Sequence, residues 1–466
     1  MIDIDVRTLA SWVGGTTNGD DDVRVHGAVT TDSREIEPGG LFIAKRGETA
    51  DGHAYVAAAA QAGAAAAIVE HTVDADIPQI CVPDAVHALA DLARAYTTHL
   101  RTHGALSRVL AITGSVGKTT TKHLLGNILQ TQAPTIWPVR SYNNEVGVPL
   151  TVMRANETTR FLVLEMGASH IGDIRYLTSI AQPDTGCVLC VGLAHAGEFG
   201  GIENTTIAKR EMVEAIPGSG AAVLNRDDVR VASMASASRA PVIWFGQGPD
   251  AHVRYAQVTS DATGIHFLLE SGKHRRQVRL HLLGEHNASN AAAAIACALS
   301  AGIDFDDAVD ALESIPAGER WRMQVMPRSD GVTIINDGYN ANPASMSAAI
   351  HTLATLRSPG HRVVAVLGGM GELGDLSDEE HDRIGRLIVR LGIDQLVAVG
   401  EPARRIYLAA NQEGSWGGEA VFVPDNDAAV EFVQRFVRPG DIVLTKSSMV
   451  YGLRLVGDRL ARGDDA

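Results

Sequence analysis

Short apolar runs alternate with amphipathic segments through the last third of the chain. The apolar runs cover residues 332–336, 362–367, 395–399 and 441–445, and the amphipathic segments cover 343–356, 378–391 and 428–437. Short apolar runs are typical of buried parallel strands, and the longer segments have the length and spacing of helices. The pattern therefore predicts an open α/β sheet with its ligand edge at the carboxyl ends of the strands.

The rest of the chain divides into two further regions. Residues from about 106 to 317 begin with the apolar run 109–112 and continue as alternating strands and helices, until Ile-Pro-Ala-Gly at 315–318 breaks the pattern. Residues 1–105 mix short β signals with an alanine-rich stretch at 57–67, and a linker follows near Gly104. Because 466 residues exceed what one core accommodates, we predict three α/β domains, which cover 1–105, 106–317 and 318–466.

Composition narrows the classes of partner. The chain has 55 acidic and 40 basic residues and a net charge of −15, and no basic segment offsets it, which argues against a nucleic-acid partner. No apolar run is long enough to span a bilayer, and the first residues lack the basic and apolar parts of a signal peptide. We therefore expect a cytoplasmic protein without a membrane partner.

Four cysteines, at positions 81, 187, 190 and 297, are too few for a disulfide framework in a chain of this length. Cys187 and Cys190 form a C-x-x-C pair, which suggests redox chemistry, but they lie in an apolar run typical of a buried strand. Strand residues three apart point to opposite faces and cannot form an undistorted disulfide. We therefore expect free, structural thiols.

The segment Thr-Gly-Ser-Val-Gly-Lys-Thr-Thr-Thr at 113–121 gives the clearest chemical signal. It follows an apolar run and precedes a helical segment, so its backbone N–H groups would face a polyphosphate at a helix N-terminus. A lysine there neutralises the outer phosphates, and the next hydroxyl holds Mg²⁺. Only Ser115 and Val116 separate its two glycines, so the loop is shorter than the usual P-loop, which has four residues there. It predicts an ATP site formed by Gly114, Ser115, Val116, Gly117, Lys118, Thr119 and Thr120.

Three further residues are candidates for metal binding or catalysis. Glu165 ends the apolar run 161–164, and a carboxylate at the tip of a strand beside a P-loop is where a Mg²⁺ ligand is expected. His195 follows another predicted strand, where it could ligate metal, carry a proton or serve a structural purpose. Lys209 lies in a helical segment, and its surroundings in the sequence indicate only a solvated side chain.

Two polar segments lie beside predicted helices. Residues 284–290 precede the alanine-rich helix expected at 291–299, and the Asn287 amide there could pair with a nucleotide base or cap the helix. Asp337 follows the strand at 332–336 and could hold a ribose hydroxyl. Pro343, a few residues later, suits the first turn of a helix.

Together these motifs resemble the Mur ligase family, the ATP-dependent amide-forming enzymes of peptidoglycan precursor assembly. Similarity covers nearly the whole chain and is carried by residues 31–34, 39–42, 46–47, 51–53, 113–121, 143–149, 165–168 and 194–195. The resemblance implies a small α/β domain for a UDP-sugar peptide, a central P-loop ATPase-like α/β domain and a C-terminal Rossmann-like α/β domain. It also implies ATP and Mg²⁺ as cofactors and a monomeric enzyme.

The resemblance assigns roles to individual residues. It makes Lys118, Glu165, His195 and Lys209 catalytic, and it assigns the metal to Thr119, Glu165, His195 and Lys209, with Lys209 open to carbamylation. Nucleotide contacts from outside the P-loop would come from Asn287, Arg322 and Asp337. Substrate contacts would come from Ser33, Arg34, Arg46, Asn143, Asn144, Tyr339 and Asn340.

Segments 321–325, 337–343 and 367–374 look most like the branch of the family that adds D-alanyl-D-alanine to UDP-N-acetylmuramoyl tripeptide through an acyl phosphate. Three positions depart from the family pattern: Val116 replaces Asn, Gly338 replaces Ser or Ala, and Gly369 replaces an acidic residue. Two alternatives therefore stay open, a paralogue that couples another carboxylate and amine, and a P-loop ATPase module without ligase activity.

Overall fold

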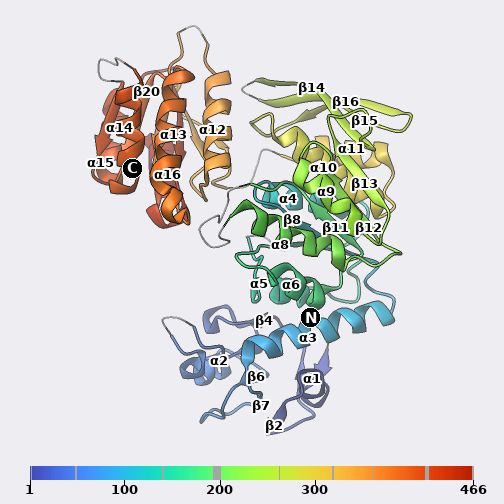
Figure 1. Ribbon diagram of the computed structural model, residues 1–466. Helices are drawn as coiled ribbons and strands as arrows, with labels where there is room; N and C mark the ends of the chain where they lie inside the picture. The colour runs from blue at the N-terminus through green and yellow to red at the C-terminus, as the bar shows by residue number, and fades with distance from the viewer. Residues whose placement is uncertain are drawn as a thin grey trace.

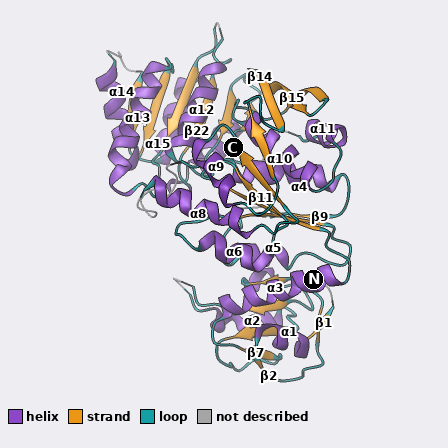
Figure 2. Cartoon of the chain, turned by 45° about the vertical axis from the view of Figure 1, so that its right-hand side comes forward, coloured by secondary structure: helices purple, strands orange, loops and turns teal. Residues whose placement is uncertain are grey.

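The computed structural model describes residues 1, 3–47, 50–138, 141–192, 201–261, 263–316, 320–358, 360–414 and 419–463. Three α/β regions follow one another along the chain, each built on its own sheet (Figure 1). The expected α/β class is confirmed, and helices and strands are interleaved in all three regions (Figure 2).

The N-terminal region contains a five-stranded sheet in the order β2-β7-β6-β5-β4, which is parallel except for β2. Its strands are β2 (Thr16–Asn18), β4 (Val29–Thr30), β5 (Leu41–Ile43), β6 (Ala66–Val69) and β7 (Gln79–Cys81), beside the pair β1 (Ile4–Asp5) and β3 (Arg24–Val25). The helices are α1 (Val6–Val13), η1 (Ser33–Glu35), η2 (Gly52–Tyr55), α2 (Val56–Gln61) and α3 (Ala85–Thr102). Helix α3 packs on the central region, against α5 and α6 (Figure 1).

The central region has a nine-stranded sheet in the order β16-β15-β14-β13-β12-β11-β8-β10-β9. Its strands are β8 (Arg108–Thr113), β9 (Thr135–Ile136), β10 (Phe161–Glu165), β11 (Thr185–Val188), β12 (Ala221–Asn225), β13 (Val242–Gly246), β14 (Val253–Asp261), β15 (Gly264–Ser271) and β16 (His274–Leu280). Its helices are α4 (Lys118–Gln130), α5 (Gly147–Val152), α6 (Asp173–Ala181), α8 (Ile202–Ala215), α9 (Val229–Ser233), η3 (Met234–Ala237), α10 (Asn287–Ser300) and α11 (Phe305–Glu313).

The expectation of alternating strands and helices is wrong for residues 253–280. There β14, β15 and β16 form consecutive antiparallel pairs with no helix between them. Exposed and buried residues alternate along most of β16, as antiparallel strands with one solvated face require. Gly272, with a φ of +58°, lies in the tight turn between β15 and β16, a connection that parallel strands cannot use.

The C-terminal region contains a six-stranded sheet in the order β17-β18-β22-β19-β20-β21, parallel apart from β17. Its strands are β17 (Gln324–Pro327), β18 (Thr333–Asn336), β19 (Val363–Leu367), β20 (Gln395–Val399), β21 (Ala420–Val423) and β22 (Ile442–Lys446). The helices are α12 (Pro343–Thr355), η4 (Gly374–Leu376), α13 (Ser377–Arg390), η5 (Glu401–Ala403), α14 (Arg404–Glu413), α15 (Asn426–Phe436), η6 (Met449–Tyr451) and α16 (Leu453–Arg462). The predicted open sheet is confirmed. Two strands, β17 and β21, and two α-helices, α14 and α16, were not predicted.

The domain boundary predicted at 317/318 falls within 317–319, outside the described residues, and the predicted boundaries stay predictions. All four cysteines are free thiols, as expected. Across the described ranges, no helix has both the length and the apolar character needed to cross a bilayer.

Candidate active site

A cavity of about 520 Å³ is lined by residues from both the central and the C-terminal regions. The central region contributes residues 115–120, Glu165 and the start of α10, and the C-terminal region contributes Asp337, residues 339–342 and Lys446. Apart from the start of α10, these residues end or follow the parallel strands β8, β10, β18 and β22, at the edge where ligands bind in open α/β sheets.

The predicted P-loop connects β8 to α4, as the sequence indicated. Gly117 caps α4 in a left-handed conformation with a φ of +85°, and a Cβ at this position would collide with the Asn290 side chain. The glycine is therefore required by both backbone conformation and close packing. The N-terminus of α4 consequently opens into the cavity with no side chain capping it.

Lys118 folds back over the loop. Its Nζ donates to the Gly114 carbonyl oxygen at 2.7 Å, and burial lowers the pKa of its ammonium, an effect that the Glu165 carboxylate opposes. A cation held beside loop amides at a helix N-terminus provides a binding site for a phosphate chain.

Glu165 lies at the end of β10 with 1% of its surface exposed. Its Oε2 accepts a 2.9 Å hydrogen bond from Thr119, and its Oε1 accepts one of 2.9 Å from the Asn143 amide. The Thr119 hydroxyl also shares a 3.2 Å bond with Ser141. Both of these hydrogen bonds to the buried carboxylate come from neutral groups, which do not neutralise its charge. A carboxylate next to the Thr119 hydroxyl is a donor set that fits Mg²⁺.

Lys209 lies on α8 and is 3% exposed, so the solvated side chain indicated by its sequence surroundings is wrong. Burial, together with repulsion from Lys118, lowers the pKa of its ammonium to about 7. Met212 and Val213 follow Lys209 by three and four residues, so they lie on the same face of α8. Both belong to the hydrophobic core, which explains why this face is buried. His195 falls within 193–200, outside the described residues.

Arg322 connects the C-terminal region to the central one. Its guanidinium donates to Ser141 at 3.1 Å and lies 4.2 Å from the centre of the Tyr339 ring. Trp321 and Met323 on either side have φ values of +64° and +48°, a left-handed conformation that non-glycine residues rarely adopt. The chain therefore takes an unusual path that directs Arg322 toward the P-loop side of the cavity.

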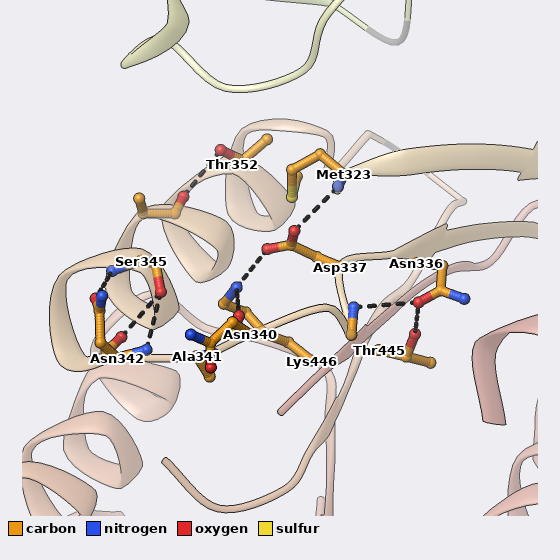
Figure 3. Close-up of polar contacts among 12 residues, drawn as sticks. Met323, Asn336, Asp337, Asn340, Ala341, Asn342, Ser345, Thr352, Thr445 and Lys446 are labelled. Carbon is orange, nitrogen blue, oxygen red and sulfur yellow. Dashed lines mark hydrogen bonds and ion pairs between the residues drawn. The ribbon is translucent and has the colours of Figure 1, made fainter. Parts of the chain in front are cut away.

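Asp337 follows β18 and accepts two hydrogen bonds (Figure 3). The Met323 N–H donates to its Oδ1 at 3.0 Å, and Lys446 Nζ donates to its Oδ2 at 2.6 Å. Asn340 lies in the same loop, and its carbonyl oxygen accepts a second bond from Lys446 at 2.9 Å.

Helix α10 begins at Asn287, four residues before the predicted start. The Asn287 amide donates to the Leu283 carbonyl oxygen at 2.8 Å, and its Oδ1 accepts from Asn290 at 2.8 Å. Both asparagines line the cavity near Gly117. The amides are thus held in place beside the P-loop.

Some predicted substrate residues lie elsewhere. Ser33 and Arg34 are on η1, where Arg34 pairs with Asp32, and Arg46 pairs with Glu70 at 2.9 Å. All three belong to the N-terminal region and are absent from the cavity lining. Asn144 also does not line the cavity, because its Oδ1 accepts the Gly147 N–H at the start of α5.

Lys446, Ser141 and Asn290 line the cavity but were not predicted as site residues. Lys446 had a usable signal, since it directly follows the apolar run 441–445 and so ends a strand at the ligand edge. Asn290 lies in the polar segment 284–290, but only Asn287 of that segment was selected, and Ser141 had no comparable signal, because only tertiary packing brings it to the cavity.

The structure explains two departures from the family pattern. A Cβ at Gly338 would overlap the backbone of Arg454, with its Cα at 2.6 Å, and a Cβ at Gly369 would lie 2.5 Å from Pro402 and 2.8 Å from Tyr451. Residues 449–454, together with Pro402 at Gly369, therefore occupy the space into which larger side chains would project, and this close packing favours glycine at both positions.

Three segments of the chain match one enzyme family. Residues 25–97 match "Mur ligase family, catalytic domain", residues 112–298 match "Mur ligase middle domain", and residues 321–449 match "Mur ligase, glutamate ligase domain". These ranges contain the P-loop residues 113–121, Glu165 and the Asp337 loop.

Named relatives match over the full length. The UDP-N-acetylmuramoyl-tripeptide–D-alanyl-D-alanine ligase of Mycobacterium tuberculosis is 40% identical over 505 residues, covering 100% of this chain and 99% of the relative. MurF from Acinetobacter baumannii has a TM-score of 0.88 at 32% identity, covering 99% of both chains. MurF ligase from Thermotoga maritima in complex with ADP has a TM-score of 0.80 at 27% identity, covering 94% of this chain and 97% of that one. The chain therefore belongs to the Mur ligase family and is an ATP-dependent ligase.

Proposed function

We propose that the protein adds D-alanyl-D-alanine to a UDP-N-acetylmuramoyl tripeptide, with ATP as the phosphoryl donor. The observation that carries the proposal is the hydrogen-bonded chain from Glu165 through Thr119 and Ser141 to Arg322, which joins the P-loop to the C-terminal region in one cavity. The named activity of relatives up to 40% identical over the full chain supplies the substrates.

The chemistry requires activation of a carboxylate. Transfer of the γ-phosphoryl group of ATP to the tripeptide carboxylate gives ADP and an acyl phosphate. The amine of D-alanyl-D-alanine then attacks the acyl carbon, and phosphate leaves from the tetrahedral intermediate with loss of the amine proton. Lys118 and the N–H groups at the start of α4 would stabilise negative charge on the phosphoryl oxygens.

The residues present fit Mg²⁺, which when bound would neutralise charge on the phosphate oxygens. Glu165 and Thr119 would hold it, together with His195 and Lys209. Lys209 with a pKa of about 7 is largely a neutral amine at physiological pH, and a neutral amine adds to CO₂ to give a carbamate and a proton. Carbamylated Lys209 would supply a carboxylate-like ligand in place of a cation.

The remaining contacts divide between the regions. Asn287, Arg322 and Asp337 would hold the nucleotide, and Asn143, Tyr339 and Asn340 would contact the reacting substrates. Ser33, Arg34 and Arg46 would bind the UDP moiety, because the two arginines present exposed cations to a diphosphate. Asn144 would act by shaping the start of α5. We place the enzyme in the cytoplasm as a monomer.

Purified protein with ATP, Mg²⁺, UDP-N-acetylmuramoyl tripeptide and D-alanyl-D-alanine tests the proposal. Phosphate release and product mass are measured with tripeptides ending in lysine and in meso-diaminopimelate. We expect release that depends on both substrates and a product heavier by one dipeptide residue. Release only with a different amine would assign the chain to a paralogous reaction, and release independent of the tripeptide would contradict ligase chemistry.

A further inference from the structure

The ends of β18 and β22 place an aspartate beside a lysine. The parallel register pairs Asn336 with Thr445, and the Asp337 N–H donates to the Thr445 carbonyl oxygen at 2.9 Å. Because side chains alternate along a strand, Asp337 and Lys446 point away from the face that carries Asn336 and Thr445. Figure 3 shows the Asp337 and Lys446 side chains directed toward each other.

Lys446 is a buried cation with two oxygen partners. Its Nζ donates to Asp337 Oδ2 at 2.6 Å and to the Asn340 carbonyl oxygen at 2.9 Å. Only 2% of the Lys446 side chain is exposed, against 14% of the Asp337 side chain. A cation at this depth is retained only where oxygens compensate its charge. One ammonium therefore joins the aspartate to the loop that follows it.

The other Asp337 oxygen holds the segment that leads into the C-terminal sheet. Oδ1 accepts the Met323 N–H at 3.0 Å, and Met323 has the left-handed φ of +48°. The contact therefore stabilises a backbone conformation that is disfavoured by itself. Arg322, one residue earlier, reaches Ser141 on the P-loop side of the cavity. The Asp337 carboxylate therefore contacts the C-terminal side of the cavity directly, and it is linked to the P-loop side through the Met323 backbone and Arg322.

We propose that Lys446 is a positioning residue that orients the Asp337 carboxylate for the ribose of ATP and, through Asn340, fixes the loop that meets the amine. This inference rests on the proposed function, because that function assigns Asp337 to the nucleotide. Lysine suits the position, since its three N–H donors and positive charge satisfy a carboxylate and a carbonyl oxygen together.

Lys446→Met tests the proposal, because methionine keeps an unbranched apolar stem and removes the donors and the charge. We expect ADP, titrated by calorimetry, to bind about tenfold more weakly, and KM for ATP to rise by about the same factor. KM for D-alanyl-D-alanine should rise less, because Asn340 loses a single contact. ADP affinity within about twofold of the wild type would overturn the proposal.

Thr445→Val is the matched control. Its hydroxyl donates to Asn336 Oδ1 at 3.3 Å, on the opposite side of the same strand pair. Gly338 still donates to that oxygen at 3.1 Å when the hydroxyl is removed. We expect ADP affinity to stay within about twofold of the wild type. An equal loss in both variants would mean that any change at this strand end disturbs the cavity, and would overturn the proposal.

A double-mutant cycle with Asp337→Asn separates positioning from a purely structural role. If Lys446 acts through Asp337, Lys446→Met should change ADP affinity by less than about twofold in the Asp337→Asn background. A full tenfold effect there would contradict the proposal. If near-ultraviolet circular dichroism shows that Lys446→Met is unfolded, Lys446→Gln replaces it under the same criteria. The two proposals are tested by different measurements. Absence of turnover by the wild type would contradict the proposed function, whereas unchanged ADP affinity in Lys446→Met would contradict the proposal for Lys446.

Discussion

The Thr119 hydroxyl donates a 2.9 Å hydrogen bond to Glu165 Oε2, which joins the first turn of α4 to the end of β10. β8, which leads into the P-loop, is the parallel neighbour of β10, with Glu165 opposite Ile112. The contact therefore follows from strand register, and it brings a hydroxyl and a carboxylate together in the lining of the cavity. Mg²⁺ bound to phosphate oxygens is usually held by one or two carboxylates and other oxygen ligands, and this pair supplies both kinds.

Lys118→Ala should lower ATP-dependent phosphate release by at least about a hundredfold, because it removes the cation that stabilises the transferring phosphoryl group. Binding of the UDP-tripeptide, measured by calorimetry, should be largely retained, since the predicted UDP contacts belong to another region. Lys273→Ala, at an exposed position in the β15–β16 turn, is the control and should retain full activity. Loss of both functions in Lys118→Ala would mean that the roles of the regions are assigned wrongly.

Glu165→Gln should reduce turnover by about a hundredfold and raise the Mg²⁺ concentration needed for half-maximal activity, because the amide keeps the shape of the side chain but lacks its charge. The melting temperature without magnesium should not fall, since a buried carboxylate with neutral hydrogen-bond donors is replaced by a neutral group. Differential scanning calorimetry with and without Mg²⁺ measures this. An unchanged Mg²⁺ requirement would exclude Glu165 as a ligand.

Lys209 should carry a carbamate in the presence of bicarbonate. With a pKa of about 7, about nine-tenths of its side chain is neutral at pH 8, whereas an ordinary lysine is neutral in well under one part in a hundred. Carbon-13 NMR with labelled bicarbonate should show a carbamate signal that weakens as the pH falls through 7. Lys209→Arg is the control and should lack the signal. A signal of equal intensity in both proteins would assign the carbamate to another amine.

The lowered pKa of Lys209 also predicts how the stability of the protein depends on pH in buffer free of CO₂. The Lys209 pKa is about 7 in the folded chain and near its ordinary value of 10.5 in the unfolded chain. Between these values the unfolded state binds the extra proton, so the free energy of unfolding rises with pH, by at most about 1.4 kcal/mol per pH unit. Below pH 7 the cost of the buried cation is fully present. Denaturant unfolding of wild type and Lys209→Met should therefore differ in pH slope between pH 7 and 9.

Gly338→Ser, which restores a residue usual in the family, should destabilise this chain by about 1–3 kcal/mol, because the new Cβ overlaps the Arg454 backbone. Gly218→Ser is the control, since a Cβ there meets only the Arg239 carbonyl oxygen at an ordinary 3.5 Å. Urea unfolding compares the two. Equal stability of Gly338→Ser and wild type would show that α16 moves away easily.

Local patterns predicted much of this protein. The C-terminal strands and helices that were predicted lie within about two residues of their predicted bounds, because their signal is the spacing of apolar residues along the chain, whereas β17, α14, β21 and α16 were not predicted. The P-loop was recognisable for the same reason: a strand, a glycine turn and a helix are contiguous. Strand-end residues such as Glu165 and Asp337 were identified because parallel strands present their carboxyl ends at a common edge.

Contacts between segments that are distant along the chain could not be predicted from the local spacing of apolar and polar residues. Lys209 resembles a solvated helical lysine until α8 packs, and Ser141 reaches the cavity only through a loop. Met323, which has a left-handed backbone, donates to Asp337, and Asp337 in turn accepts from Lys446, more than a hundred residues later. The sequence by itself determined the elements and their ligand edges, through local periodicity. Only the tertiary structure decided which buried charges meet, because burial and pairing arise when remote segments pack together.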